Sequence, residues 1–203
     1  MKYKYLVTAL LLSILAAPAA AAETNESFQF RGVDWGLSMT DLIDVVIKNE
    51  YKNGLEEDDY TVEIDKFVIF STTVGGLKCE ADYFLVDGKF ADGAYFLTED
   101  HSNIEQYYSD YTTLVEKYTK KYGEPVVDSK KWIGDSIYKD KPDSYGMAVG
   151  IGDLQRVTRW EAEDGSLIEF FMTGDNYDIT TRIDYLCPGY YDLDGLSSGD
   201  EGI

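Results

Sequence analysis

The segment from residue 102 to residue 125 constrains the fold of this chain more than any other stretch. Its apolar and aromatic residues recur at spacings of four and three, the period of a helix with one apolar stripe. Ser102 is suited to cap the first turn, and Gly123 followed by Pro125 is typical of a helix end. The pattern therefore predicts a long amphipathic helix, whose stripe consists of Ile104, Tyr108, Tyr111, Val115, Tyr118 and Tyr122.

A shorter helix is predicted near the start of the chain. Ser38 followed by Asp41 has the form of a capping box, with Asp in place of the usual Glu or Gln. Apolar residues follow at helical spacing, so residues 39–49 should be helical. Trp35, which precedes this helix, is expected to be a core anchor rather than a ligand-stacking residue.

Elsewhere the hydrophobic period changes to two, which indicates strands. Asp87-Gly88 and Asp164-Gly165 have the composition of tight hairpin turns. The predicted strands are Phe67–Val74, Leu77–Val86, Phe90–Thr98, Lys130–Ile133, Tyr145–Ile151, Gln155–Ala162, Leu167–Met172 and Ile179–Cys187.

The order helix, meander, helix, meander predicts an α+β protein with two helices packed on antiparallel β-meander sheets. The halves 28–100 and 101–188 each open with a Ser-capped helix and contain one Asp-Gly hairpin, which favours a duplicated unit. A single sheet of six to eight strands under both helices is the alternative. Residues 23–188 form the predicted domain, and the Gly-, Ser- and acid-rich residues 189–203 are predicted to be a flexible acidic tail.

Residues 1–22 have the features of a signal peptide. Lys2 and Lys4 precede an apolar run of about a dozen residues, and alanines end the segment before Glu23. The run is shorter than the roughly 20 residues that span a bilayer, and no later stretch is long enough. The sequence therefore predicts a secreted protein, extracellular or periplasmic, without a membrane span.

The chain is strongly acidic, with a formal net charge of −20. Residues 1–22 carry two lysines and no acid, so their removal makes the charge −22. Such a charge repels phosphate backbones, which excludes nucleic acid as an expected partner. Solubility of an exported protein is the favoured explanation, ahead of a specific cationic ligand.

Two cysteines, Cys79 and Cys187, both fall on strand faces that we expect to be buried. Export permits disulfides to persist, so this pair is a disulfide candidate. The alternative is two buried free thiols that behave as small apolar side chains.

The sequence offers little support for catalysis. His101 is the only histidine, and no Gly-x-Ser-x-Gly elbow or phosphate-binding loop is present. A carboxylate pair for glycan hydrolysis depends on a separation that only folding sets. We therefore predict no catalytic residue and no cofactor.

A metal site is also not predicted. One histidine and two distant cysteines do not make a zinc site. Asp192, Asp194 and Asp200 weakly resemble a calcium loop, but the glycine is misplaced and no flanking helices are evident. A solvated acidic segment is the favoured interpretation.

Tyrosine is unusually abundant, with 17 residues in the chain. Tyr107 lies off the helix stripe, and Tyr190 and Tyr191 lie in the C-terminal segment. Tyrosine is enriched at interfaces because a large rigid ring carries a hydrogen-bonding tip. These three residues are the candidate binding surface. The alternative is that the tyrosines fill a sheet face that is half exposed to solvent, which would explain their abundance as well.

Two fragments, Trp35-Gly36-Leu37-Ser38 with Asp41-Leu42 and Lys121-Tyr122-Gly123 with Pro125, carry a resemblance. They resemble exported bacterial proteins built from helix-plus-meander units. These are the outer-membrane assembly lipoproteins of the BamE/SmpA type and the tandem-repeat β-lactamase inhibitory proteins. The chain lacks the lipidation cysteine and a Gly-x-Pro stop after the first helix. The resemblance implies a non-catalytic binding or assembly module.

These observations favour a secreted, non-enzymatic protein that binds another protein through a Tyr-rich surface. An exported glycan hydrolase that uses carboxylates, and a calcium-dependent exported protein, are the two alternatives.

Overall fold

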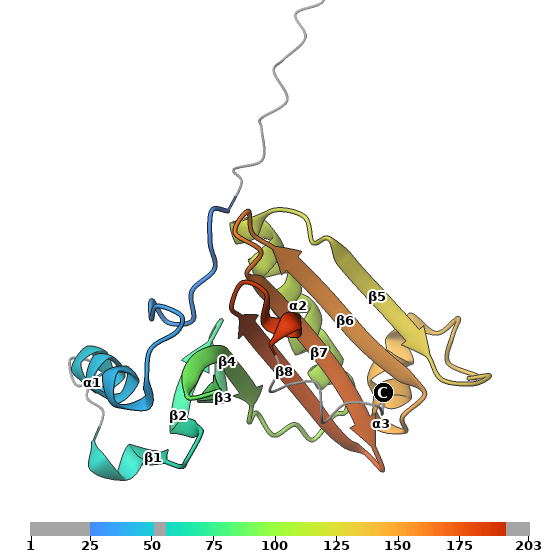
Figure 1. Cartoon of the computed structure of the whole chain (residues 1–203). Helices are drawn as coiled ribbons and strands as arrows, with labels where there is room; N and C mark the ends of the chain where they lie inside the picture. The colour runs from blue at the N-terminus through green and yellow to red at the C-terminus, as the bar shows by residue number, and fades with distance from the viewer. Residues whose placement is uncertain (1–24, 51–55, 194–203) are drawn as a thin grey trace, which may run out of the picture.

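The fold is one eight-stranded antiparallel sheet with α-helices against it (Figure 1). The computed structural model describes residues 25–50 and 56–193, so the predicted signal peptide lies outside the described residues. The helices are α1 (Met39–Glu50), α2 (Glu105–Tyr122) and α3 (Tyr145–Gly150), with short 3-10 turns η2 (Glu57–Asp59), η3 (Pro142–Ser144) and η4 (Tyr190–Asp192). The strands are β1 (Tyr60–Val62), β2 (Lys66–Val74), β3 (Leu77–Val86), β4 (Lys89–Leu97), β5 (Val127–Trp132), β6 (Leu154–Glu161), β7 (Leu167–Asp175) and β8 (Asp178–Leu186).

The strand order is β1-β2-β3-β4-β8-β7-β6-β5, so two four-stranded meanders meet along β4 and β8. Tyr95 of β4 pairs with Ile183 of β8 at this junction. The α+β class and the antiparallel pairing are confirmed. The two halves share one sheet, as in the single-sheet alternative.

Helix α2 covers the sheet through the predicted stripe. Tyr111 of the stripe and Leu114, which lies outside it, are fully buried, and four further stripe residues pack against the same core: Tyr108, Val115, Tyr118 and Tyr122. The phenolic hydroxyls remain hydrogen-bonded: Tyr111 to the Thr158 hydroxyl at 2.8 Å, and Tyr118 to that of Tyr185 at 2.9 Å. Ser102 is not the cap; Asn103 Oδ1 instead accepts the Glu105 amide at 3.1 Å.

The segment predicted as the strand Tyr145–Ile151 is wrong, because it forms the helix α3. The Glu105 carboxylate of α2 accepts the amides of Gly146 at 2.7 Å and Met147 at 3.0 Å. A β-carbon on Gly146 would lie 2.6 Å from the Ile104 carbonyl oxygen, so glycine is needed for this close approach. A contact from a distant helix therefore overrides the local strand pattern, and the described part of the chain has three α-helices where two helices were predicted.

An aromatic cluster fixes the N-terminal segment to the centre of the sheet. The ring of Phe30 lies 4.9 Å from that of Tyr83, 4.8 Å from Tyr95 and 5.5 Å from Tyr185, measured between centroids. Phe30 rests on Gly93, where a β-carbon would lie 2.2 Å from the ring. The same buried cluster contains residues of α1 and α2, so both helices cover one face of the sheet.

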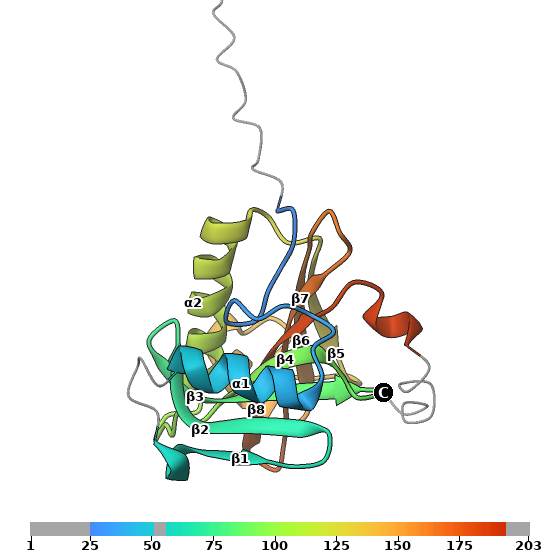
Figure 2. The same cartoon turned by 60° about the vertical axis from the view of Figure 1, so that its left-hand side comes forward.

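Among the described residues, the short turn η4 is the helical element on the other face of the sheet. Figure 2 shows α2 and η4 on opposite sides of the strands. Within the part of the chain that the structure describes, no helix has the length and apolar character needed to cross a membrane.

Candidate functional site

The sheet face opposite the helices, called here the open face, carries a row of charged side chains. The β-ladder register places Asp82 opposite Ala94, Ala94 opposite Asp184, and Asp184 opposite Glu169. Residues that face each other in register share one side of a sheet. Three carboxylates from β3, β8 and β7 therefore lie on the open face, and Arg159 of β6 continues the row.

Arg182 links two acidic side chains on this face. Its Nη2 lies 2.9 Å from Asp92 Oδ2, and its Nε donates to Asp184 Oδ1. The guanidinium also lies over two rings, 5.1 Å from the Phe96 centroid and 5.6 Å from that of Phe84. Arg182 is thus held by both carboxylates and aromatic faces.

Asp92 is the most perturbed acid of the open face. It is only 2 % exposed, and its Oδ1 has no hydrogen-bond partner among the described residues. Burial, aided by the charge of Asp184, raises the pKa of Asp92 to about 8 against the opposing effect of Arg182. Burial likewise raises the pKa of Asp184 to about 6. Because burial disfavours the charged form, Asp92 holds its proton to a higher pH than an exposed aspartate does.

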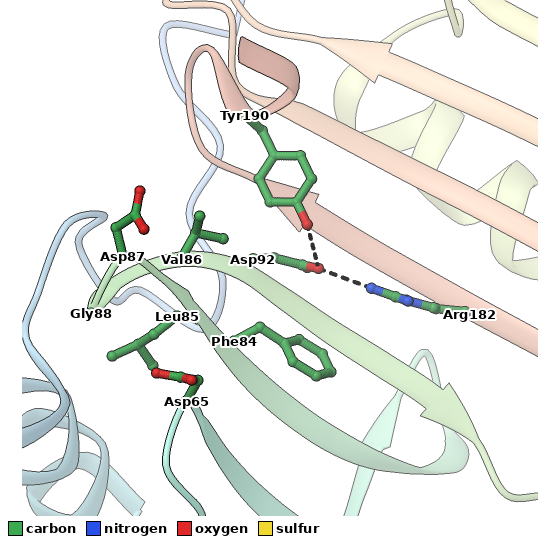
Figure 3. A pocket seen from close by; sticks show the side chains of 9 residues that line it. All are labelled: Asp65, Phe84, Leu85, Val86, Asp87, Gly88, Asp92, Arg182 and Tyr190. Atoms are coloured by element: carbon green, nitrogen blue, oxygen red, sulfur yellow. Dashed lines mark hydrogen bonds and ion pairs between the residues drawn. The ribbon is translucent and has the colours of Figure 1, made fainter. Parts of the chain in front are cut away.

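The turn η4 lays two tyrosines over these acids. It begins after Gly189, whose positive φ of 70° turns the chain back over the sheet. The Tyr190 hydroxyl donates to Asp92 Oδ2 at 3.4 Å, as Figure 3 shows. The Tyr191 hydroxyl donates to Glu169 Oε2 at 2.5 Å, although 58 % of Tyr191 remains exposed. η4 is therefore tied to the open face through its side chains.

Tyr190 stands between two hollows of the open face, since it lines both together with Asp92 and Arg182. The turn hollow has a volume of about 560 Å³ and lies beside the β3–β4 turn; its other lining residues are Asp65, Phe84, Leu85, Val86, Asp87 and Gly88. The strand hollow has a volume of about 440 Å³; its other lining residues are Val157, Arg159, Glu169, Phe170, Phe171, Asp184, Leu186 and Tyr191.

The three predicted binding tyrosines are not brought together. Tyr190 and Tyr191 lie on the open face, whereas Tyr107 lies on α2, on the helix side of the sheet. Its hydroxyl accepts the His101 amide at 3.1 Å, and the rings of Tyr107 and His101 meet edge to face at 4.8 Å. His101 itself contacts Asp110 at 2.6 Å. Tyr107 is thus part of local packing at the start of α2.

The disulfide candidate is wrong in this structure: Cys79 and Cys187 are both free and buried. Cys79 lies opposite Leu97, and the Cys187 amide donates to Ala91 at 2.9 Å. Leu97 and Ala91 are six residues apart on β4, so the cysteines lie at opposite ends of that strand, about 20 Å apart at 3.4 Å per residue. A disulfide requires α-carbons within about 7 Å. Burial raises the pKa of Cys79 to about 12, as expected for a thiol that serves as a small apolar side chain.

The calcium candidates are only partly described. Asp192 belongs to η4, whereas Asp194 and Asp200 lie outside the described residues, as does most of the predicted acidic tail. Among residues 25–50 and 56–193, no three His, Cys, Asp or Glu side chains are grouped so as to hold a metal ion. The calcium hypothesis remains a prediction.

Sequence reasoning missed Asp92, Arg182 and Asp184. The alternation Arg182-Ile-Asp184-Tyr within a predicted strand places the two charges on one face, and this signal was available. The sequence carries no comparable signal for Asp92, because its burial results from η4 and from the strands beside it. The assembled site combines carboxylates, arginines and aromatic rings, groups that can recognise polar and charged side chains.

The comparisons with known proteins add no relative: no protein-family model, no curated protein and no solved structure matches this chain.

Proposed function

We propose that this chain is a secreted, non-enzymatic binding module whose open face contacts another protein through Tyr190 and Tyr191. The observation that carries the proposal is the contrast between the faces of one sheet: among the described residues, α-helices cover one face and the short turn η4 lies on the other. Tyrosine and arginine are enriched at protein interfaces, and the open face presents both.

Charge favours a basic partner. The chain carries −20 formally and −22 without residues 1–22. Opposite charges on two proteins steer their encounter and select between partners. We therefore propose a partner with a positively charged surface, and no nucleic acid.

We also propose a duplicated helix-plus-meander unit, the architecture that the sequence resemblance implies. Two meanders, β1–β4 and β5–β8, are each preceded by a helix and meet at the β4–β8 pair. This arrangement supports, as a proposal, a duplicated unit and a binding or assembly role of the kind that the resemblance implies.

The test compares capture of exported proteins by three purified chains: the unchanged protein, Tyr190→Ala/Tyr191→Ala, and Tyr107→Ala as the control on the helix side. The unchanged chain and the control should retain the same basic protein, while the double variant loses it at least tenfold, about 1.4 kcal/mol of binding. Equal retention by all three chains, or capture of acidic proteins only, would overturn the proposal.

A second candidate function is glycan hydrolysis, favoured by the two acids of raised pKa in the strand hollow. A protonated Asp92 beside an ionised Asp184 has the composition of an acid–base pair. Arg182 engages both carboxylates, which favours a structural role for them instead. Hydrolysis of a glycan panel that Asp92→Asn abolishes without loss of folding would establish the enzyme.

A further inference from the structure

We infer that the turn hollow binds the guanidinium group of an arginine side chain that a basic protein partner presents, an inference that rests on the proposed protein-binding role.

The open face already uses one combination of groups twice. Arg182 pairs with Asp92 and Asp184 and lies over the Phe84 and Phe96 rings. In the same way, Arg159 pairs with Glu169 and lies 5.7 Å from the Tyr191 ring centroid. Each arginine is held by carboxylate and aromatic ring together. Guanidinium groups suit such sites because they are planar, bind carboxylates in a fork and stack on rings.

The turn hollow also combines carboxylates with an aromatic ring, but two of its carboxylates have no cationic partner among the described residues. Asp65 and Asp87 are exposed and form no ion pair with any described residue, and no described cation lies over the Tyr190 ring. The one basic lining residue, Arg182, is already engaged by Asp92 and Asp184. The hollow is therefore net negative and bounded by the ring of Tyr190.

A buried acid at the hollow supplies a second, independent observation. Asp92 lines the hollow and is only 2 % exposed. Its Oδ1 has no hydrogen bond in the described part of the chain. Burial opposes the negative charge of Asp92, and a cation seated in the hollow beside it favours that charge. An arginine brings up to five N–H donors.

The backbone around the hollow is fixed before any partner arrives. Asp87 and Gly88, the predicted hairpin turn, have φ of 51° and 72°, the pair of left-handed values typical of a type I′ turn. The Asp65 carbonyl accepts the Leu85 amide at 2.8 Å, which links the β1–β2 turn to β3. A preformed site loses little conformational freedom on binding.

The binding is expected to strengthen as pH rises. The charged and titratable groups that face Asp92 are Arg182 and Asp184 on β8, Tyr190 on η4 and Asp82 on β3. A bound guanidinium favours the ionised form of Asp92, whose pKa is about 8 in the free protein. Binding therefore releases a proton, and affinity should increase between pH 6 and pH 9.

The experiment titrates the full-length exported chain with N-acetyl-arginine amide and follows backbone amide resonances. Saturable shifts should centre on Phe84, Asp87, Gly88 and Tyr190. The neutral isostere N-acetyl-citrulline amide should cause none. Asp87→Asn should weaken binding about fivefold, the effect of one exposed charge contact, while Asp175→Asn, which removes an exposed acid elsewhere, should not. Asp92→Asn should remove the pH dependence.

Equal shifts with citrulline, or equal weakening by Asp87→Asn and Asp175→Asn, would overturn the inference. Equal binding of N-acetyl-lysine amide would overturn the assignment to arginine. If the arginine probe fails while Tyr190→Ala/Tyr191→Ala still loses its partner, this inference falls and the proposed function stands. If the probe binds but no partner is captured, the proposed function falls instead.

Discussion

The two faces of the central sheet use tyrosine in opposite ways. On the covered face, Tyr111 and Tyr118 of α2 pack against the sheet, Tyr111 fully buried and Tyr118 partly so, and their hydroxyls bond to side chains of the strands. On the open face, Tyr190 and Tyr191 lie over carboxylates and remain partly in solvent. The number of tyrosines therefore does not identify a binding surface. What identifies it is which group each hydroxyl bonds to and whether other residues bury the ring.

The largest expected effect falls on the covered face, at Phe30. Phe30→Ala removes a fully buried ring from between three aromatic neighbours and should lower the free energy of unfolding by about 3–5 kcal/mol. Urea unfolding measures it. Gly93→Ala should also destabilise the protein, but less in the Phe30→Ala background, because the ring it clashes with is gone. Additive losses would contradict the proposed contact.

The cap of α3 should come next. Glu105→Gln keeps the side-chain shape but replaces a charged acceptor of two amides by a neutral one, so we expect a loss of about 2 kcal/mol. Glu116→Gln, on the same helix, is the matched control and should change the free energy of unfolding little. A loss below that of the control would show that α3 forms without its cap.

On the open face, ionisation of Asp92 should lower the free energy of unfolding as pH rises. The folded chain holds a proton on Asp92 up to about pH 8, whereas the unfolded chain releases it near pH 4, so stability falls between these values. Relative to its value at pH 5, the free energy of unfolding of the unchanged protein should fall by on the order of 3–4 kcal/mol at pH 8, and Asp92→Asn should not show this fall. A parallel pH profile for the two proteins would contradict a buried, protonated Asp92.

The smallest stability effect is expected at Tyr191. It is largely exposed, so Tyr191→Ala should change the free energy of unfolding by no more than about 0.5 kcal/mol. Loss of partner capture in this variant would therefore report on binding rather than on folding. A large drop in the melting temperature would instead make Tyr191 part of the fold.

Patterns within one segment were predictable, and contacts between segments were not. The α2 stripe and the strand Leu77–Val86 follow from periods that the backbone imposes locally. The error at Tyr145–Gly150 arose because Glu105 caps that segment from another helix. The disulfide was misjudged because a shared inward face does not reveal position along a strand, and Asp92 was missed because η4 covers it from a distant part of the chain.

The most direct test of the binding role is amide hydrogen exchange of the chain with and without its captured partner. If the open face is the interface, exchange should slow at η4 and at the Asp87–Gly88 turn, while α1 and α2 remain unchanged. Protection confined to α1 or α2, with η4 and the turn unaffected, would place the interface on the covered side and contradict the account.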